Sequence, residues 1–288
     1  MSAPSCVARL KYSYTLTFSP SMQRRTLSQI IAALALGSSA LVGFAQQSIT
    51  LKFHTFMSPL SNVCLSMHKP WIDKVTKESG GRIKFEAYPA MQLSGTAAQL
   101  YDQVKDGVVD IVWTLPGYTA GRSPRIEAFE LPFMMNNAEA TSMALWDFLH
   151  TVGADDFKET RLSAVNVHGP TRPIAKMLGY LGAVPIGLPL PAISDALLKG
   201  TSYSCVLPRE VLPSIKDQEL TRFHLNFDPA GGAPYTAAFV MDMNTKRYSR
   251  LPDDLKKIID NNFGLVTSGW MGKTQQDNDP VRRKNAKG

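Results

Sequence analysis

The fold is decided by two short stretches that share one order of elements. Residues 103–116 read QVKDGVVDIVWTLP, and residues 196–208 read ALLKGTSYSCVLP. Each stretch is predicted to contain the end of a helix, a glycine that stops it, an apolar strand and then Leu-Pro. A near-continuous apolar strand such as residues 108–114 is typical of a parallel sheet that is covered on both faces. Two such units indicate an α/β protein with two related lobes, although a likeness this short leaves chance similarity as the alternative.

The sequence on either side continues the alternation of strands and helices. Strands are predicted at residues 49–53, 82–88, 184–187, 202–207 and 235–243, and helices at 62–79, 96–106, 173–180, 192–199 and 251–262. Pro70 lies inside the first of these helices and predicts a kink. In open α/β sheets, ligands bind beyond the carboxyl ends of the strands. The segments that follow Trp113 and Val206 are therefore expected to face each other across a cleft.

Residues 1–45 are predicted to be an export signal rather than part of the fold. Arg24 and Arg25 precede an apolar stretch at residues 30–44, and the small residue Ala45 lies just before Gln46. This is the order of a secretory signal peptide, and the apolar stretch is shorter than the roughly 20 residues that span a bilayer. We predict a signal core at residues 22–45 behind an over-long start, cleavage near Ala45, and export to the periplasm.

The basic excess of the chain is concentrated at its two ends. The formal charge is +7, but four basic residues and no acids lie in residues 1–45, and four more basic residues lie in residues 282–288. No basic face for nucleic acid is implied. The basic end is interpreted as a solvated chain end, with a polyanion-binding arm as the alternative. Cys64 and Cys205, far apart and outside any metal-ligand spacing, are interpreted as buried thiols, and a bridge between them stays open.

No sequence pattern predicts catalysis, a cofactor or a metal. The chain has no G-x-S-x-G elbow, no glycine-rich phosphate loop, no H-E-x-x-H and no Cys/His cluster at zinc spacing. Cys64 and His68 stand four residues apart on a predicted helix, as a nucleophile and its base would. Such pairs are common on helix faces, and no orienting acid is evident. We therefore expect neither an enzyme nor a bound cofactor.

Candidate binding residues gather in residues 114–133, TLPGYTAGRSPRIEAFELPF. A long loop rich in glycine and proline that directly follows a buried strand is typical of a binding segment. Trp113 and Tyr118 would supply an aromatic wall, while Arg122 and Arg125 would attract an anion. The alternatives are that Trp113 is a core residue and that Arg125 pairs with a nearby glutamate.

Six motifs occur along the chain in a fixed order. They are residues 77–85 (KESGGRIKF), 88–93 (YPAMQL), 99–111 (QLYDQVKDGVVDI), 117–122 (GYTAGR), 130–133 (ELPF) and 181–187 (LGAVPIG). In this order they resemble the DctP family of periplasmic solute-binding proteins of TRAP (tripartite ATP-independent periplasmic) transporters. The resemblance covers nearly all of residues 46–271.

This resemblance implies an α/β fold of the two-lobed periplasmic binding protein type (type II-like), with mixed sheets flanked by helices, a central ligand cleft and a hinge. Lobe I would comprise residues 46–164 and 229–262, and lobe II residues 165–228 and 263–288. Such a protein closes around a carboxylate and delivers it to a two-component membrane permease. The expected partners are therefore a small organic anion and the permease subunits, without nucleic acid, and the protein is expected to be a monomer.

The chain departs from the family where the ligand should be held. The family binds the carboxylate with an arginine in a Lys-x-Arg-x-Pro motif, but residues 167–172 (VHGPTR) join the hinge strand directly to the end of that motif. His168 stands in the place of the arginine, and Arg172 is the substitute anchor because its planar fork of donors fits a carboxylate. Arg209 replaces a family tryptophan and is a further candidate cation. The predicted ligand-binding residues are Trp113, Tyr118, Arg122, His168, Arg172 and Arg209.

Lobe II is expected to be shortened internally and at its end, because the sequence stops soon after Trp270, where the family continues with helices that brace the lobes. Two alternatives follow for the function. One is a decayed or non-transport ligand-binding module, such as a chemoreceptor. The other, which is less favoured, is a periplasmic enzyme on the same kind of fold.

Overall fold

The structure is a computed structural model that describes residues 48–119, 121–133, 135, 137–167, 172–207, 211–212, 216, 219–225 and 236–285. At residues 163–167, 172–174 and 279–285 this description covers the backbone alone. Ser48–Gly288 form one compact unit, and the predicted signal peptide lies outside the described residues. In the described part of the chain, no helix is both long and apolar enough to cross a membrane.

Five strands of the described chain form one mixed sheet in the order β2-β1-β3-β5-β4. They are β1 (Ile49–Thr55), β2 (Ile83–Tyr88), β3 (Ile111–Thr114), β4 (Arg161–Val167) and β5 (Ala238–Met243). β1 pairs in parallel with β2 and β3, whereas β5 is antiparallel to β3 and β4. Since β3 and β4 both oppose β5, they run in the same direction as each other and as β1. The carboxyl ends of β1, β3 and β4 therefore lie at one edge of the sheet.

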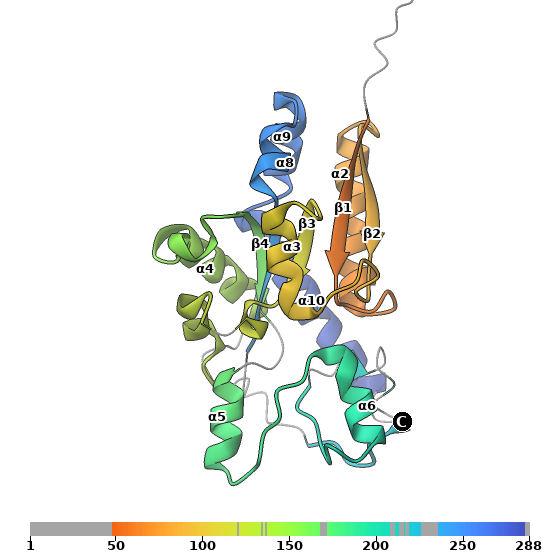
Figure 1. Ribbon diagram of the computed structural model, residues 1–288, viewed down its shortest axis with the longest axis vertical. Coiled ribbons are helices and arrows are strands. Elements are labelled where there is room, and N and C mark those ends of the chain that lie inside the picture. The colour runs from red at the N-terminus through yellow and green to blue at the C-terminus, as the bar shows by residue number, and fades with distance from the viewer. Residues whose placement is uncertain are drawn as a thin grey trace, which may run out of the picture. The chain divides into compact units, whose positions relative to one another are not determined.

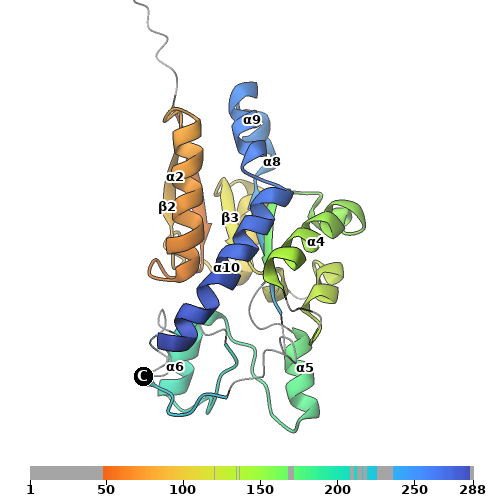
Figure 2. The same cartoon turned by 180° about the vertical axis from the view of Figure 1, so that it is seen from behind.

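Helices connect and flank these strands. The first half of the chain contains η2 (Val63–His68), α2 (Lys69–Glu78), η3 (Ala97–Gln99), α3 (Leu100–Asp106), η4 (Pro116–Tyr118), η5 (Pro124–Glu130) and α4 (Ala138–Thr151). The second half contains η6 (Ala154–Phe157), α5 (Arg172–Tyr180), η7 (Leu190–Ala192), α6 (Ile193–Leu198), α8 (Thr245–Ser249), α9 (Asp253–Asn261) and α10 (Leu265–Asn285). α2 runs alongside β2 (Figure 1), and α10 packs against α4 (Figure 2).

The core is divided into two clusters, and the first includes the consecutive β3 residues Ile111, Val112 and Trp113, whose side chains alternate between the two faces of the sheet. Met241 of β5 belongs to the first cluster together with Trp71 of α2, while Val240 belongs to the second together with Leu145 of α4. Successive side chains of a strand point to opposite faces, so β5 contributes to both clusters. This arrangement confirms the predicted α/β class with a mixed sheet between helices.

Local sequence signals account for several element ends. Thr96 and Gln99 form a capping box at the start of η3, and Gly107 ends α3 with a φ of 79°. A left-handed residue at this position favours glycine because no Cβ is present to collide. The predicted helix at residues 62–79 changes from π to α geometry at Lys69, one residue before Pro70. A proline ring collides with the carbonyl four residues earlier, so the irregular turn lies where the proline requires one.

The strands predicted at residues 184–187 and 202–207 are wrong, because neither segment is a strand. Val184 is 90% exposed and Tyr203 is 95% exposed. A strand needs a neighbour to pair its N–H and C=O groups, and no described strand lies beside either segment. The likeness between the two stretches that suggested a repeat therefore holds for the helix and its glycine stop, and fails for the strand.

Three smaller expectations also need correction. β3 begins at Ile111 rather than at residue 108, because Val108 is exposed and the Asp110 carboxylate accepts a hydrogen bond from the Lys52 amide at 2.8 Å. Pro252 is the N-cap of α9 rather than part of its first turn. Cys64 and Cys205 are not joined by a disulfide, and both are half-buried rather than fully buried.

Candidate functional site

The candidate site lies at the edge of the sheet where β1, β3 and β4 end. Thr55 and Trp113 are paired near that edge, and Val167 at the end of β4 is paired with Ala238. The loop that follows β3 leaves the sheet there, and β4 ends there at Val167 (Figure 1). This brings the predicted binding segments, which are about fifty residues apart in sequence, to one end of the fold.

Aromatic rings form a contiguous cluster at this edge. Trp113 stacks on Phe239 with ring centroids 5.6 Å apart, and the His68 ring meets it edge-on at 5.1 Å. Phe56, which directly follows β1, contacts Phe239 at 6.1 Å and Tyr118 at 5.3 Å. Trp113 is 1% exposed, so it occupies the core position that the sequence left open as its alternative. Tyr118 and Phe239 are only partly buried and form the outer part of the cluster.

Tyr118 is held by a short turn directly after the buried strand β3. The η4 turn is closed by hydrogen bonds from the Tyr118 amide to the Leu115 carbonyl and from the Thr119 amide to the Pro116 carbonyl. The Tyr118 hydroxyl accepts a hydrogen bond from the Leu190 amide at 3.3 Å. Burial raises the pKa of Tyr118 to about 12, so the phenol stays neutral and its oxygen remains an acceptor.

Both arginines of the loop already have carboxylate partners. Arg122 pairs with Asp102 at 2.8 Å and lies 4.8 Å over the Tyr101 ring. Arg125 pairs with Asp156 at 3.0 Å. An arginine that is neutralised in this way attracts a ligand carboxylate less than an unpaired one would, because the two carboxylates compete for the same donors.

The remaining three predicted residues all follow β4 in the sequence. Arg172 is the first residue of α5, which begins five residues after the end of β4. Its backbone is described and its side chain is not. His168 and Arg209 lie outside the described residues. The assignment of all six ligand-binding residues thus stays a prediction.

Cys64 and His68 approach each other but are not arranged as a nucleophile and base. The Cys64 sulfur lies 3.6 Å from Nδ1 of His68. Burial raises the pKa of the Cys64 thiol and lowers that of His68 to about 3. Both shifts disfavour the thiolate–imidazolium pair that nucleophilic catalysis requires.

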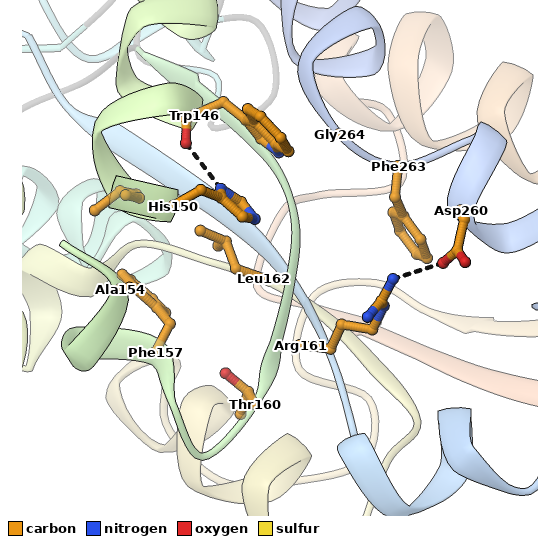
Figure 3. A pocket seen from close by; sticks show the side chains of 11 residues that line it. Trp146, His150, Ala154, Phe157, Thr160, Arg161, Leu162, Asp260, Phe263 and Gly264 are labelled. Carbon is orange, nitrogen blue, oxygen red and sulfur yellow. Dashed lines mark hydrogen bonds and ion pairs between the residues drawn. The ribbon is translucent and has the colours of Figure 1, made fainter. Parts of the chain in front are cut away.

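A groove of about 410 Å³ lies at the other end of the sheet (Figure 3). Rings from Trp146, His150 and Phe263 line it, and Arg161 pairs there with Asp260 at 2.6 Å. Arg161 is the first residue of β4, so the groove lies at the opposite end of that strand from the candidate site. This groove is not a second candidate for the predicted carboxylate site, because Asp260 already neutralises its arginine, Arg161.

Sequence reasoning missed Phe56, Phe239 and Leu190. Phe239 follows from strand alternation, because it lies two residues before Met241 and therefore shares its face. The signal for Leu190 is its position between Pro189 and Pro191, which restricts the local backbone. Neither signal indicates which distant residues the Phe239 and Leu190 side chains will contact.

Comparison with known proteins identifies the class of this fold and site. Residues 53–150 match the family DctP, described as bacterial extracellular solute-binding protein, family 7. The chain is 61% identical to a TRAP solute-binding protein from Rhodoferax ferrireducens, which was solved in complex with copurified benzoate. The two structures agree with a TM-score of 0.81, and the match covers 83% of this chain and 82% of the other. It is 44% identical, with a TM-score of 0.79 and the same coverage, to a marine metagenome TRAP solute-binding protein specific for aromatic acid ligands, solved with 3-hydroxybenzoate.

A more distant relative is the outer membrane transporter protein TsaT of Comamonas testosteroni. It is 29% identical over 293 residues, which cover 92% of this chain and 83% of the relative. The mixed sheet with loops gathered at its carboxyl edge is thus that of an extracellular solute-binding protein. The chain belongs to the DctP family of TRAP transporter solute-binding proteins.

Proposed function

We propose that this protein captures an aromatic monocarboxylate in the periplasm and delivers it to the membrane permease of a TRAP transporter. The observation that carries the proposal is the 61% identity to a TRAP solute-binding protein that copurified with benzoate. The second relative, at 44% identity, is specific for aromatic acid ligands. Two relatives with ligands of one chemical class favour that class over the aliphatic dicarboxylates.

The aromatic cluster at the carboxyl edge supports a ring-shaped ligand. Tyr118 and Phe239 are its partly buried members. The buried rings of Phe56 and Trp113 contact Tyr118 and Phe239, respectively. Aromatic rings prefer offset-stacked or edge-on neighbours, and such pairs contribute about 0.5–1.5 kcal/mol beyond area burial. A benzoate ring that contacts Tyr118 and Phe239 would extend a cluster of this geometry.

Arg172 is proposed as the anchor of the ligand carboxylate. The two arginines of the first-lobe loop, Arg122 and Arg125, already bind aspartates. Arg172 follows β4 at the carboxyl edge of the sheet, and a guanidinium binds a carboxylate with two parallel hydrogen bonds. His168 is proposed to assist, and Arg209 is a further candidate.

The relatives' role in TRAP transport supports a periplasmic location and a permease as the partner. We propose cleavage of the signal peptide near Ala45, which N-terminal sequencing of the exported protein would test. The lobe boundaries at residues 164–165, 228–229 and 262–263, and the monomeric state, remain proposals. Limited proteolysis and light scattering would test them.

Benzoate is expected to stabilise the exported protein against heat. A ligand at 100 times its dissociation constant contributes about 2.7 kcal/mol, which raises the Tm of a domain of this size by roughly 5–10 °C. Differential scanning fluorimetry measures the shift. Benzyl alcohol, which lacks the carboxylate, and succinate, which lacks the ring, are the controls. An unchanged Tm with benzoate in a cooperatively unfolding sample would contradict the proposal.

Replacing Arg172 with alanine is expected to weaken benzoate binding by about 1.5–3 kcal/mol, the usual contribution of a hydrogen bond to a charged group. Isothermal titration calorimetry measures the affinity. Lys176→Ala is the matched control, because Lys176 is an exposed cation one turn further along α5. Equal affinities of wild type and Arg172→Ala would indicate that Arg209 or Arg122, rather than Arg172, binds the ligand carboxylate.

A further inference from the structure

Residues 175–207, a described stretch of the predicted second lobe, contact the core of the predicted first lobe through Leu190. Ala196 is the buried residue of this stretch, and Leu190 is the residue that packs against the core cluster containing Phe56 and Trp113. Large apolar side chains elsewhere in the stretch are exposed, including Leu181 at 75% and Leu198 at 69%. Leu190 thus differs from the exposed leucines Leu181 and Leu198 because its side chain packs against the core cluster.

The backbone of Leu190 is bound at the same place as its side chain. Its amide donates to the Tyr118 hydroxyl at 3.3 Å, and Tyr118 itself contacts Phe56. Pro189 and Pro191 have no amide hydrogen, so Leu190 supplies the one backbone donor between residues 189 and 191. The prolines also restrict the backbone on both sides, which lowers the entropy lost when this contact forms.

We propose that Leu190 is a specificity-determining residue of the binding site, positioned by the hydrogen bond between its amide and Tyr118. This inference rests on the proposed function, because it concerns which aromatic acids are accepted. A ligand ring that contacts Tyr118 and Phe239 must share the surface of the aromatic cluster with the Leu190 side chain. The leucine therefore limits the size of the substituents that the ring can carry.

Shortening this side chain should relax the limit on ring size. Isothermal titration with benzoate and with 4-tert-butylbenzoate gives the ratio of the two affinities for each variant. In Leu190→Ala the ratio is expected to shift toward the bulky acid by about tenfold or more, which is roughly 1.4 kcal/mol. Leu198→Ala, an exposed leucine of the same segment, should keep the wild-type ratio. A wild-type ratio in Leu190→Ala overturns the inference and leaves the proposed function intact.

Hydrogen exchange tests the contact without any ligand. Since neither flanking proline has an amide hydrogen, mass-spectrometric fragments that differ by residues 189–191 report the Leu190 amide alone. Tyr118→Phe removes the acceptor and should speed exchange at Leu190 about tenfold. The Ala192 amide, which donates to the Pro189 carbonyl at 2.9 Å, should be unaffected.

An unprotected Leu190 amide in the wild type overturns the inference, whatever the protein binds. A protected amide in a protein that binds no aromatic acid overturns both the proposed function and the role of Leu190 in specificity. A protected amide together with the shifted affinity ratio supports both.

Discussion

Replacing Asp242 with asparagine is expected to stabilise this protein at pH 8 by up to about 4 kcal/mol. Asp242 is fully buried in β5, an interior strand of the sheet. One carboxylate oxygen accepts a hydrogen bond from the Thr160 hydroxyl at 3.3 Å, and the other is buried without a hydrogen-bond partner among the described residues. Burial raises the pKa of Asp242 to about 7, because a charge in a low-dielectric interior is poorly solvated.

The sign of the pH dependence follows from this raised pKa. Between pH 3.8, the ordinary value, and pH 7 the folded protein binds a proton that the unfolded chain does not. Stability therefore falls as the pH rises through this window, and the full cost is present above it. Asparagine is neutral at every pH and nearly isosteric, so the variant avoids that cost.

Urea unfolding between pH 4 and pH 8 measures the effect. The wild type should lose stability across this range and Asp242→Asn should lose less, so that the gap between the two curves widens from pH 4 to about pH 7 and stays constant above that. Asp195→Asn is the matched control, because Asp195 is an exposed aspartate whose side chain is 63% accessible. Parallel curves for wild type and Asp242→Asn would show that Asp242 is not the group that titrates.

Replacing Gly272 with valine is expected to destabilise the protein by about 3 kcal/mol or more. Gly272 lies where α10 packs against α4, and a Cβ there would stand 2.3 Å from the Ala138 carbonyl oxygen and 2.6 Å from the Ser142 hydroxyl. A backbone carbonyl cannot rotate away as a flexible side chain can. The two helices would have to separate, and the cluster that includes Leu145 would lose packing.

Gly179→Ala is the control for this substitution. Gly179 lies in α5, and no atom lies within 4 Å of the position that its Cβ would occupy. Alanine in a helix is favoured over glycine by about 0.5–1 kcal/mol, so this variant should be slightly more stable than the wild type. Chemical denaturation of both variants measures the difference. A free energy of unfolding for Gly272→Val within 0.5 kcal/mol of wild type would contradict the close approach of the helices.

Much of the fold between residues 49 and 114 could be predicted because its signals are local. The capping box at Thr96, the left-handed glycine at Gly107 and the irregular turn before Pro70 each depend on a few neighbouring residues. The candidate site was predicted less completely. The loop after β3 was located from its composition, but its arginines could not be assigned, since Asp156 lies 31 residues from Arg125 in sequence.

By itself, the sequence determined the α/β class, the order of the elements in residues 49–114 and the family, because backbone preferences, helix stops and motif order are properties of adjacent residues. The tertiary structure alone decided that residues 184–187 form no strand, that Trp113 is part of the core, and that Leu190 meets Tyr118. Each of these depends on a partner distant in sequence. A strand is stabilised by the neighbouring strand, a buried ring by the side chains packed around it, and a charge by its opposite partner. These partners come together only when the chain folds.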